Sequence, residues 1–168
     1  MVRCEAPADV AETIRLARRT GLPTAARSGG HCFAGHSSTD GVVIDVTPMR
    51  SVSVAGGTAT IGAGARLGEV YDSLEEHDLG ILGRRHGLPA DHLLAAQVVL
   101  ADGRVVDCDD HHDQELFWAL RGAGAGNFGV VTSLVFRTLP APPTTSFHLV
   151  WPHTHAAAVV DAWQRWAP

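Results

Sequence analysis

The chain has 168 residues, the length of one ordinary domain, and its net charge of −5 argues against a nucleic-acid binder with a broad basic face. No apolar run approaches the roughly 18 residues of a membrane span, and the first residues lack the basic-then-apolar pattern of a secretory signal, so we expect a cytoplasmic protein without a membrane segment. Cys4, Cys32 and Cys108 cannot all pair internally and have no metal-type spacing, which excludes a disulfide scaffold.

The first predicted element is a helix from Asp9 to Thr20. Asp9 followed by Glu12 has the spacing of a capping box, and Gly21 ends the apolar pattern. A short strand over residues 22–26 then leads into a glycine-rich turn. We interpret the basic residues of the helix as its solvated face: Arg15, Arg18 and Arg19.

The middle of the chain is predicted to hold short strands joined by tight hairpins. Gly56-Gly57 and Asp102-Gly103 are hairpin signals, and each lies between two β-prone runs. Residues 78–92 show no clear pattern and are predicted as loop or weak helix. The predicted strands cover residues 42–46, 52–55, 58–61, 95–100, 104–108 and 130–138, and the predicted helices cover residues 65–76 and 113–121.

Prolines 140, 142 and 143 mark a boundary, because such a cluster ends any regular element. We therefore divide the chain into a domain of residues 1–139 and a C-terminal part of residues 140–168. That part is predicted to hold a strand over 146–151 and a helix over 155–166. The helix carries Trp163 and Trp166 on one face, which is compatible with self-association. The fold class is α+β, with small antiparallel meanders between helices.

Three glycine clusters are candidate binding sites, because successive backbone amides without side chains bind phosphate oxygens at little steric cost. The first is Arg27-Ser28-Gly29-Gly30-His31, with Gly35 and Ser37 following. Its adjacent glycines let the main chain approach a pyrophosphate, and the two serines add hydroxyl donors. An ordinary loop with a surface histidine is the alternative interpretation.

The other two clusters lie in different contexts. Residues 62–68 join a strand to a helix, but the strand belongs to a hairpin, so tight packing of the helix is the better interpretation. In the third cluster Gly124, Gly126 and Gly129 match G-x-G-x-x-G, although a helix precedes this loop and a strand follows it, the reverse of the required order. A nicotinamide-type Rossmann fold is therefore not expected. The third loop can still present amides to a nucleotide.

Ten histidines do not by themselves indicate a metal site. The closest sets, His111-His112-Asp113 and the pair His153 and His155, have neither helical nor C-x-x-C spacing. No Ser–His–Asp order rises above chance, and the G-x-S-x-G motif is absent. We expect no metal.

Several short motifs occur in the order found in one flavoprotein family. They are Arg27-Ser28-Gly29-Gly30-His31 with Gly35, Val43-Ile44-Asp45, Gly62-Ala63-Gly64, Ala101-Asp102-Gly103, Leu116-Phe117-Trp118-Ala119-Leu120-Arg121-Gly122 and Asn127-Phe128-Gly129-Val130-Val131. Together they resemble the FAD-binding domain of the vanillyl-alcohol oxidase/p-cresol methylhydroxylase superfamily, in particular its berberine-bridge-enzyme-like branch. The resemblance covers residues 2–139.

The resemblance implies two small α/β subdomains that clasp FAD, followed by a separate substrate domain. It implies that the backbone amides of residues 28–31 cradle the pyrophosphate. His31 matches the histidine that many members bond to the 8α carbon of the flavin. The resemblance therefore implies that His31 is the residue through which FAD can be covalently attached. Residues of the third cluster would lie near the adenine. The implied cofactor-binding residues are Arg27, Ser28, Gly29, Gly30, His31, Gly35, Ser37, Gly126, Asn127, Gly129 and Val131.

The implied function is that of an FAD-linked oxidase, in which the flavin takes a hydride from an alcohol or activated C–H of a small-molecule substrate and passes electrons to oxygen. The family's catalytic tyrosine and substrate pocket have no counterpart here, so no catalytic residue is assigned. A glycine-rich segment is also missing where Leu79-Gly80-Ile81-Leu82 runs directly into Gly83. We therefore expect a truncated FAD-binding domain. The alternative is a catalytically silent remnant that folds without flavin.

Overall fold

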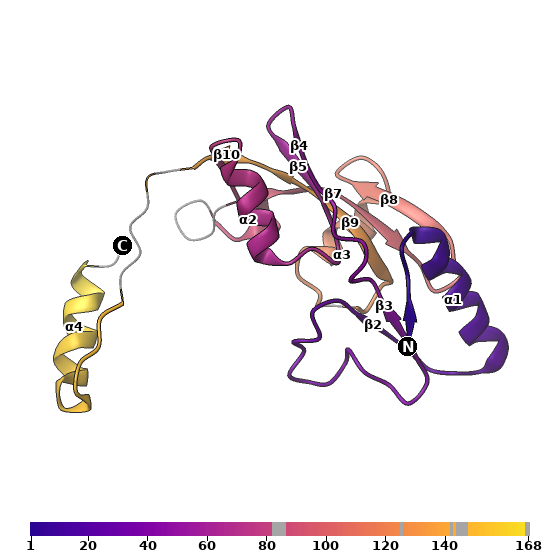
Figure 1. Cartoon of the computed structure of the whole chain (residues 1–168), viewed down its shortest axis with the longest axis horizontal. Helices are drawn as coiled ribbons and strands as arrows, with labels where there is room; N and C mark the ends of the chain where they lie inside the picture. Colours follow the sequence, from indigo (N-terminus) through magenta and orange to yellow (C-terminus); the bar gives the residue numbers. More distant parts are fainter. Residues whose placement is uncertain (82–86, 125, 142, 144–147, 167–168) are drawn as a thin grey trace.

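The computed structural model describes residues 1–81, 87–124, 126–141, 143 and 148–166. Within these ranges the strands form a three-stranded parallel sheet, a five-stranded antiparallel sheet and a two-stranded ribbon (Figure 1). This mixture of helices and sheets confirms the predicted α+β class. In the described part of the chain, no helix is both long and apolar enough to cross a membrane.

The parallel sheet is formed by the N-terminal part of the chain. Its strands are β1 (Val2–Arg3), β2 (Thr24–Arg27) and β3 (Val42–Asp45), and β3 lies in the middle. α1 (Pro7–Thr20) carries the chain from β1 to β2, the two outer strands, because parallel strands of one sheet need a crossover connection. A long loop then joins β2 to β3, and it begins with the first glycine cluster.

The start of α1 differs from the prediction. Ala6 precedes the helix and Pro7 occupies its first turn, where the missing N–H is not needed. Asp9 is therefore not the N-cap but the third helical residue. Its carboxylate accepts hydrogen bonds from the amides of Glu5 and Ala6, both at 2.9 Å. The side chain still caps the helix, but from inside the first turn.

The antiparallel sheet has the order β4-β5-β9-β7-β8. The two predicted hairpins are confirmed, since β4 pairs with β5 across Gly56-Gly57 and β7 pairs with β8 across Asp102-Gly103. Between them lies β9, which pairs with both β5 and β7. The strands are β4 (Val52–Ala55), β5 (Thr58–Gly62), β7 (Leu93–Val99), β8 (Val105–Asp109) and β9 (Val130–Arg137).

Both predicted helices are present, and they pack against this sheet. Leu74 of α2 (Leu67–Glu75) is fully buried in a cluster with Ala59 and Ile61 of β5. Phe117 of α3 (Gln114–Leu120) is fully buried in a second cluster with residues of β7 and β8. Both helices are therefore held by packing of one apolar face.

The region between α2 and β7 is more ordered than the predicted loop or weak helix. A short strand, β6 (Leu79–Gly80), pairs antiparallel with β10 (Leu139–Pro140), and Pro89–His92 form one turn of 3-10 helix. This pairing joins segments far apart in the sequence, which local patterns do not reveal. The predicted junction at Leu82-Gly83 lies outside the described residues.

The C-terminal part contains the predicted helix, α4 (Ala156–Trp166), preceded by a 3-10 turn over His153–His155. In Figure 1 α4 stands apart from the sheets. None of its residues is buried, and the rings of Trp163 and Trp166 lie 5.4 Å apart between centroids. The strand predicted over 146–151 is wrong for residues 148–151, which are not in a strand, while residues 146–147 lie outside the described ranges.

One apolar cluster connects the parallel sheet with the antiparallel one. It contains Val10 and Ile14 of α1 and Ile44 of β3, together with Val99 of β7 and Val130 of β9. Of these five residues Val10, Ile44 and Val99 are fully buried. The two sheets therefore share a core, and the surfaces beside that core face each other.

Candidate functional site

The first glycine cluster forms a turn directly after β2. No hydrogen bond within the described residues uses the backbone amides of Ser28, Gly29, Gly30 or His31. A Cβ atom on Gly30 would lie 2.7 Å from Nη2 of Arg27, so the guanidinium packs onto the backbone of this turn. Free amides beside a cation are the features that bind a phosphate group.

The imidazole of His31 ends this turn and is exposed to solvent. Gly35 lies beyond it in the loop, also exposed, and Ser37 is half-buried. The amide of Gly35 donates a hydrogen bond of 3.1 Å to the carbonyl of Cys32, so the loop folds back just after His31. The structure thus keeps Arg27–His31 together but uses the Gly35 amide within the loop.

The third cluster forms a loop between α3 and β9. Nδ2 of Asn127 donates a hydrogen bond of 2.8 Å to the carbonyl of Ala123, which closes the loop. Within the described residues no hydrogen bond uses the amides of Gly126 or Gly129, whereas Ala125 lies outside the described ranges. This loop therefore also presents backbone donors.

The second cluster is different, because its amides already have partners. The amide of Ala63 donates to Thr132 at 3.0 Å, and that of Gly64 donates to Met49 at 2.8 Å. A Cβ atom on Gly62 or Gly64 would collide with the carbonyl oxygens of Met49 and Val46. These glycines allow the end of β5 to pack closely on the segment after β3. Close packing was predicted, but with a helix as the partner, and Gly68 of α2 has no atom within 4 Å of an added Cβ.

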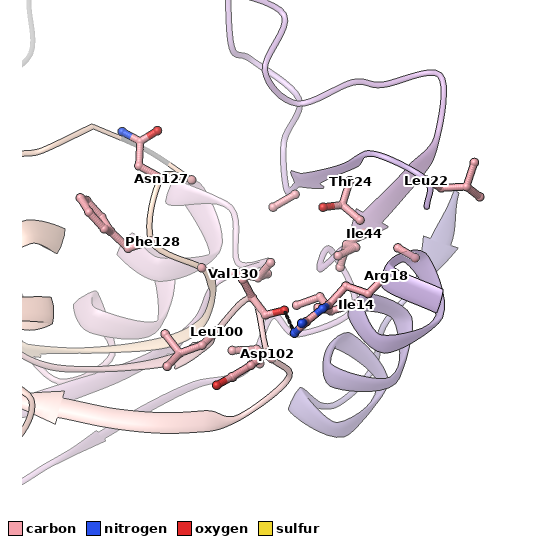
Figure 2. Close-up of a pocket in the computed structure, with 16 residues that line it drawn as sticks. Ile14, Arg18, Leu22, Thr24, Ile44, Leu100, Asp102, Asn127, Phe128 and Val130 are labelled. Atoms are coloured by element: carbon pink, nitrogen blue, oxygen red, sulfur yellow. Dashed lines mark hydrogen bonds between the residues drawn. The ribbon is translucent and has the colours of Figure 1, made fainter. Parts of the chain in front are cut away.

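A cleft of about 700 Å³ lies between the two sheets, a volume in the range of small-molecule sites. In Figure 2, Asn127, Phe128 and Val130 lie on one side of it and Thr24 and Ile44 on the other. The cleft therefore joins the third glycine cluster to β2, the strand that leads into the first cluster.

Only some of the predicted site residues line this cleft. Gly126, Asn127 and Gly129 do. The residues of β2 that line the cleft are Thr24 and Ala26, and the predicted site residues that follow in the chain do not line it: Arg27–His31, Gly35 and Ser37. Val131 does not line it either, because it pairs with Val98 and packs into the core under α3. Its neighbour Val130 lines the cleft instead.

Sequence reasoning missed the contribution of α1 and the hairpin between β7 and β8. Nη1 of Arg18 donates a hydrogen bond of 3.0 Å to the carbonyl of Ala101, and Nη2 of Arg15 donates one of 3.1 Å to Gly103. All three arginines of α1 are exposed, as predicted for a solvated face, but Arg15 and Arg18 also hold the hairpin. Their partners are more than 80 residues away in the sequence, so no local pattern could reveal the contacts. Arg18 and Asp102 also line the cleft.

Asp45 ends β3 next to the turn, opposite Arg27 in the sheet register. Burial raises its pKa, but hydrogen bonds from Oγ1 and the amide of Thr47, at 2.6 and 3.0 Å, and the charges of Arg3 and Arg27 outweigh burial. The pKa of Asp45 is therefore below its ordinary value, and the carboxylate is ionised at neutral pH.

The described residues contain no group of three or more histidine, cysteine, aspartate or glutamate side chains that could hold a metal ion. His112 instead lies 3.0 Å from the carboxylate of Asp109 through its Nδ1 atom. That carboxylate also accepts the amides of His111 and His112, at 2.7 and 2.8 Å. This cluster is thus a turn stabilised by its own hydrogen bonds.

Comparison with known proteins points to flavin binding. A family profile described as "FAD binding domain" matches residues 1–83. The FAD-linked oxidoreductase YvdP of Bacillus subtilis is 34% identical, over 95% of this chain and 42% of its own. The xylooligosaccharide oxidase of Thermothelomyces thermophilus is 35% identical, over 91% of this chain and 37% of its own.

Solved structures agree with the sequence relatives. The 6-hydroxy-D-nicotine oxidase of Arthrobacter nicotinovorans superposes with a TM-score of 0.78 at 33% identity, covering 82% of this chain and 36% of its own. The berberine-bridge-enzyme-like protein 1 of Physcomitrella patens has a TM-score of 0.78 at 31% identity, again covering 82% of this chain and 36% of its own.

The chain spans less than half the length of the curated relatives it matches. The match to YgaK of Bacillus subtilis, 32% identical over 44% of that protein, runs over 198 positions and includes all 168 residues of this chain. About 30 positions of that match therefore have no residue here, as expected if an internal segment is missing. The chain belongs to the berberine-bridge-enzyme-like family of FAD-linked oxidases, whose cofactor is FAD, and its residues 1–83 match an FAD binding domain.

Proposed function

We propose that this chain is the FAD-holding part of an oxidase, in which the turn after β2 binds the diphosphate and the cleft receives the adenosine end of the cofactor. Bound flavin supplies the chemistry, hydride acceptance from an alcohol or activated C–H followed by electron transfer to oxygen. The contribution of this chain is to bind and orient the cofactor. Small-molecule substrates are expected, since relatives include oxidases of xylooligosaccharide and 6-hydroxynicotine.

The observation that carries the proposal is the contrast between the glycine clusters. In residues 62–65 the amides of Gly62, Ala63, Gly64 and Ala65 donate to carbonyls of the chain itself. The amides of residues 28–31 have no such acceptor within the described residues, and the guanidinium of Arg27 lies against them. A diphosphate would supply both the missing acceptors and the charge that Arg27 attracts.

The position of His31 supports covalent attachment of the flavin. The residue immediately follows the free amides, and its ring is exposed, so a cofactor held by its diphosphate could reach the imidazole. A covalent bond would prevent loss of the cofactor and alter the electron affinity of the flavin. No residue of this chain is assigned to proton removal from the substrate.

We further propose that residues 1–139 form the FAD-binding domain and that residues 140–168 begin a substrate domain. Phe136 is the last residue of the sequence that belongs to the apolar clusters of the two sheets, and α4 contributes no buried residue. Limited proteolysis followed by mass spectrometry tests this division. Early cleavage between Pro140 and Ala156 is expected, with the remaining fragment still folded, whereas early cuts within the sheets would contradict it.

Titration with FAD tests the proposed function directly. We expect the purified chain to carry flavin absorbance in the visible, or to gain it on addition of FAD, with binding followed by calorimetry. Arg27→Gln should weaken binding about tenfold, because a charge-assisted contact to phosphate is lost. Arg50→Gln removes an arginine that instead pairs with Glu69 at 3.6 Å, and should bind as the wild type does. A colourless protein that takes up no FAD would contradict the proposal and match the silent remnant.

A further inference from the structure

The cleft is lined by one charged side chain that has a partner of opposite charge and by one that does not. Of the 16 lining residues, Arg18 and Asp102 carry charge. The carboxylate of Asp102 is held by Arg104, through Nε at 2.7 Å and the backbone amide at 2.9 Å. Arg18 donates through Nη1 to Ala101, and within the described residues it has no acidic partner. The remaining guanidinium donors are therefore free for a ligand.

The position of Arg18 along the cleft defines which end of a ligand it would meet. Arg18 of α1 lines the cleft and reaches Ala101 of the hairpin, while Leu22 and Thr24 line it near the start of β2 (Figure 2). At about 3.3 Å per residue, β2 carries the chain about 13 Å from Thr24 to the turn at Ser28. A ligand whose diphosphate is bound by that turn therefore extends toward Arg18 with its opposite end.

The walls near Arg18 suit an aromatic ring with acceptor atoms. Ile14, Ala17, Ile44 and Val130 supply apolar surface, and the guanidinium supplies planar, fixed donors. Adenine has both properties, since its faces are apolar and its edge carries acceptor nitrogens. The flavin ring would not occupy the part of the cleft near Arg18, because it is proposed to lie beside His31, after the other end of β2.

We propose that Arg18 is a specificity-determining residue for the adenosine half of the cofactor, to which its guanidinium donates hydrogen bonds at the ring nitrogens or ribose oxygens. This inference rests on the proposed binding of FAD by the turn after β2. Arg18 acts at the same time on the protein, because its bond to Ala101 holds the wall of the cleft formed by residues 100–102.

A matched pair of variants separates these two roles. Arg15 also fastens the hairpin to α1, through Gly103 at 3.1 Å, but it does not line the cleft. Arg15→Gln therefore loosens the hairpin without removing a donor to the ligand. Arg19→Gln is a control for charge alone, because Arg19 pairs with Glu12 at 3.2 Å on the outer side of α1. Neither variant changes a residue that lines the cleft.

The test is calorimetric titration of the full chain with ADP and with FAD, alongside thermal unfolding. Arg18→Gln should weaken both ligands about tenfold, the usual loss for a hydrogen bond from a charged donor, while Arg15→Gln and Arg19→Gln stay within twofold of the wild type. Arg18→Lys, which keeps the cation, should lose less than Arg18→Gln and guards against failure of the glutamine variant to fold.

The possible failures are distinguishable. Equal affinity of the wild type and Arg18→Gln for ADP would overturn the role of Arg18 while leaving FAD binding intact. An equal loss of affinity in Arg15→Gln would mean that Arg18 acts only by holding the hairpin, and would also overturn the inference. A wild-type chain that binds neither ADP nor FAD would overturn both this inference and the proposed function.

Discussion

Nη2 of Arg27 lies 2.7 Å from the point that a Cβ atom on Gly30 would occupy. Side chain and backbone of the same turn are thus in direct contact, so a methyl group on residue 30 would require the guanidinium to shift. The φ angle of Gly30 is +73°, in the left-handed region that other residues adopt at a cost. The turn therefore depends on Gly30 in two ways, by conformation and by space.

Gly30→Ala should weaken FAD binding at least tenfold. The new methyl group must push the guanidinium away, and the left-handed backbone adds a cost of about 1–2 kcal/mol. Calorimetry with FAD gives the affinity, and thermal unfolding reports the fold. Gly35→Ala is the matched control, because Gly35 has a similar φ of +77° in the same loop but no atom within 4 Å of the added Cβ. Equal affinity of Gly30→Ala and the wild type would contradict the assignment of this turn.

His31→Ala should abolish flavin that survives acid precipitation while leaving dissociable FAD binding in place. The reason is that the imidazole is the group proposed to form the covalent bond, whereas the backbone amides hold the phosphates. Absorbance of the acid-washed pellet measures the bound flavin. His36→Ala changes another exposed histidine of the same loop and should keep the wild-type signal. Acid-stable flavin in His31→Ala would exclude attachment at this residue.

Phe117→Ala should lower the free energy of unfolding by about 3–5 kcal/mol. The ring of Phe117 is fully buried under the antiparallel sheet, and the guanidinium carbon of Arg121 lies 4.3 Å from its centroid. Urea denaturation measures the change. Trp118, the next residue of α3, is 70% exposed, so Trp118→Ala should cost no more than about 0.5 kcal/mol. Similar losses in both variants would mean that α3 packs through a different face.

Asp109 should make unfolding sensitive to acid. The amide of His111 and the side chain and amide of His112 lower the pKa of Asp109 to about 2. A lowered folded-state pKa means that the carboxylate stabilises the fold above its unfolded pKa of about 3.9, and that this contribution is lost as the pH falls toward 2. Asp109→Asn should therefore flatten the dependence of the melting temperature on pH between about 4 and 2.

NMR titration of the Asp109 carboxyl carbon measures that pKa independently. Asp40→Asn is the control, since it removes the same charge from an exposed side chain that has no hydrogen bond within the described residues. The control should keep the wild-type slope of melting temperature against pH. A midpoint near 4 for Asp109, or an unchanged slope in Asp109→Asn, would contradict the role of this turn.

The parts of the fold that the sequence predicted are those whose causes are local. Gly56-Gly57 and Asp102-Gly103 each join two strands that are adjacent in the sequence, and both hairpins are present. The close packing of Gly62 and Gly64 also follows from neighbouring elements. In each case a few consecutive residues define the backbone path, so the pattern contains the necessary information.

The parts that the sequence did not predict depend on distant partners. β9 was predicted as a strand, but its central place follows from pairing with β7 from Val130 to Phe136 and with β5 from Ser133 to Arg137. The bonds from Arg15 and Arg18 to the hairpin, and the ribbon of β6 and β10, likewise join segments separated by many residues. The cleft is formed by these distant contacts, and for that reason its α1 wall was missed.

The core shared by the two sheets has a consequence for how a ligand enters. Val99 and Val130 pack against Ile14 and Ile44, directly beside the cleft. Moving the two sheets apart would expose these side chains to water, at a free-energy cost of about 25 cal/mol for each Å² of apolar surface uncovered. Because of this cost, we expect a nucleotide to enter the cleft without the two sheets moving apart.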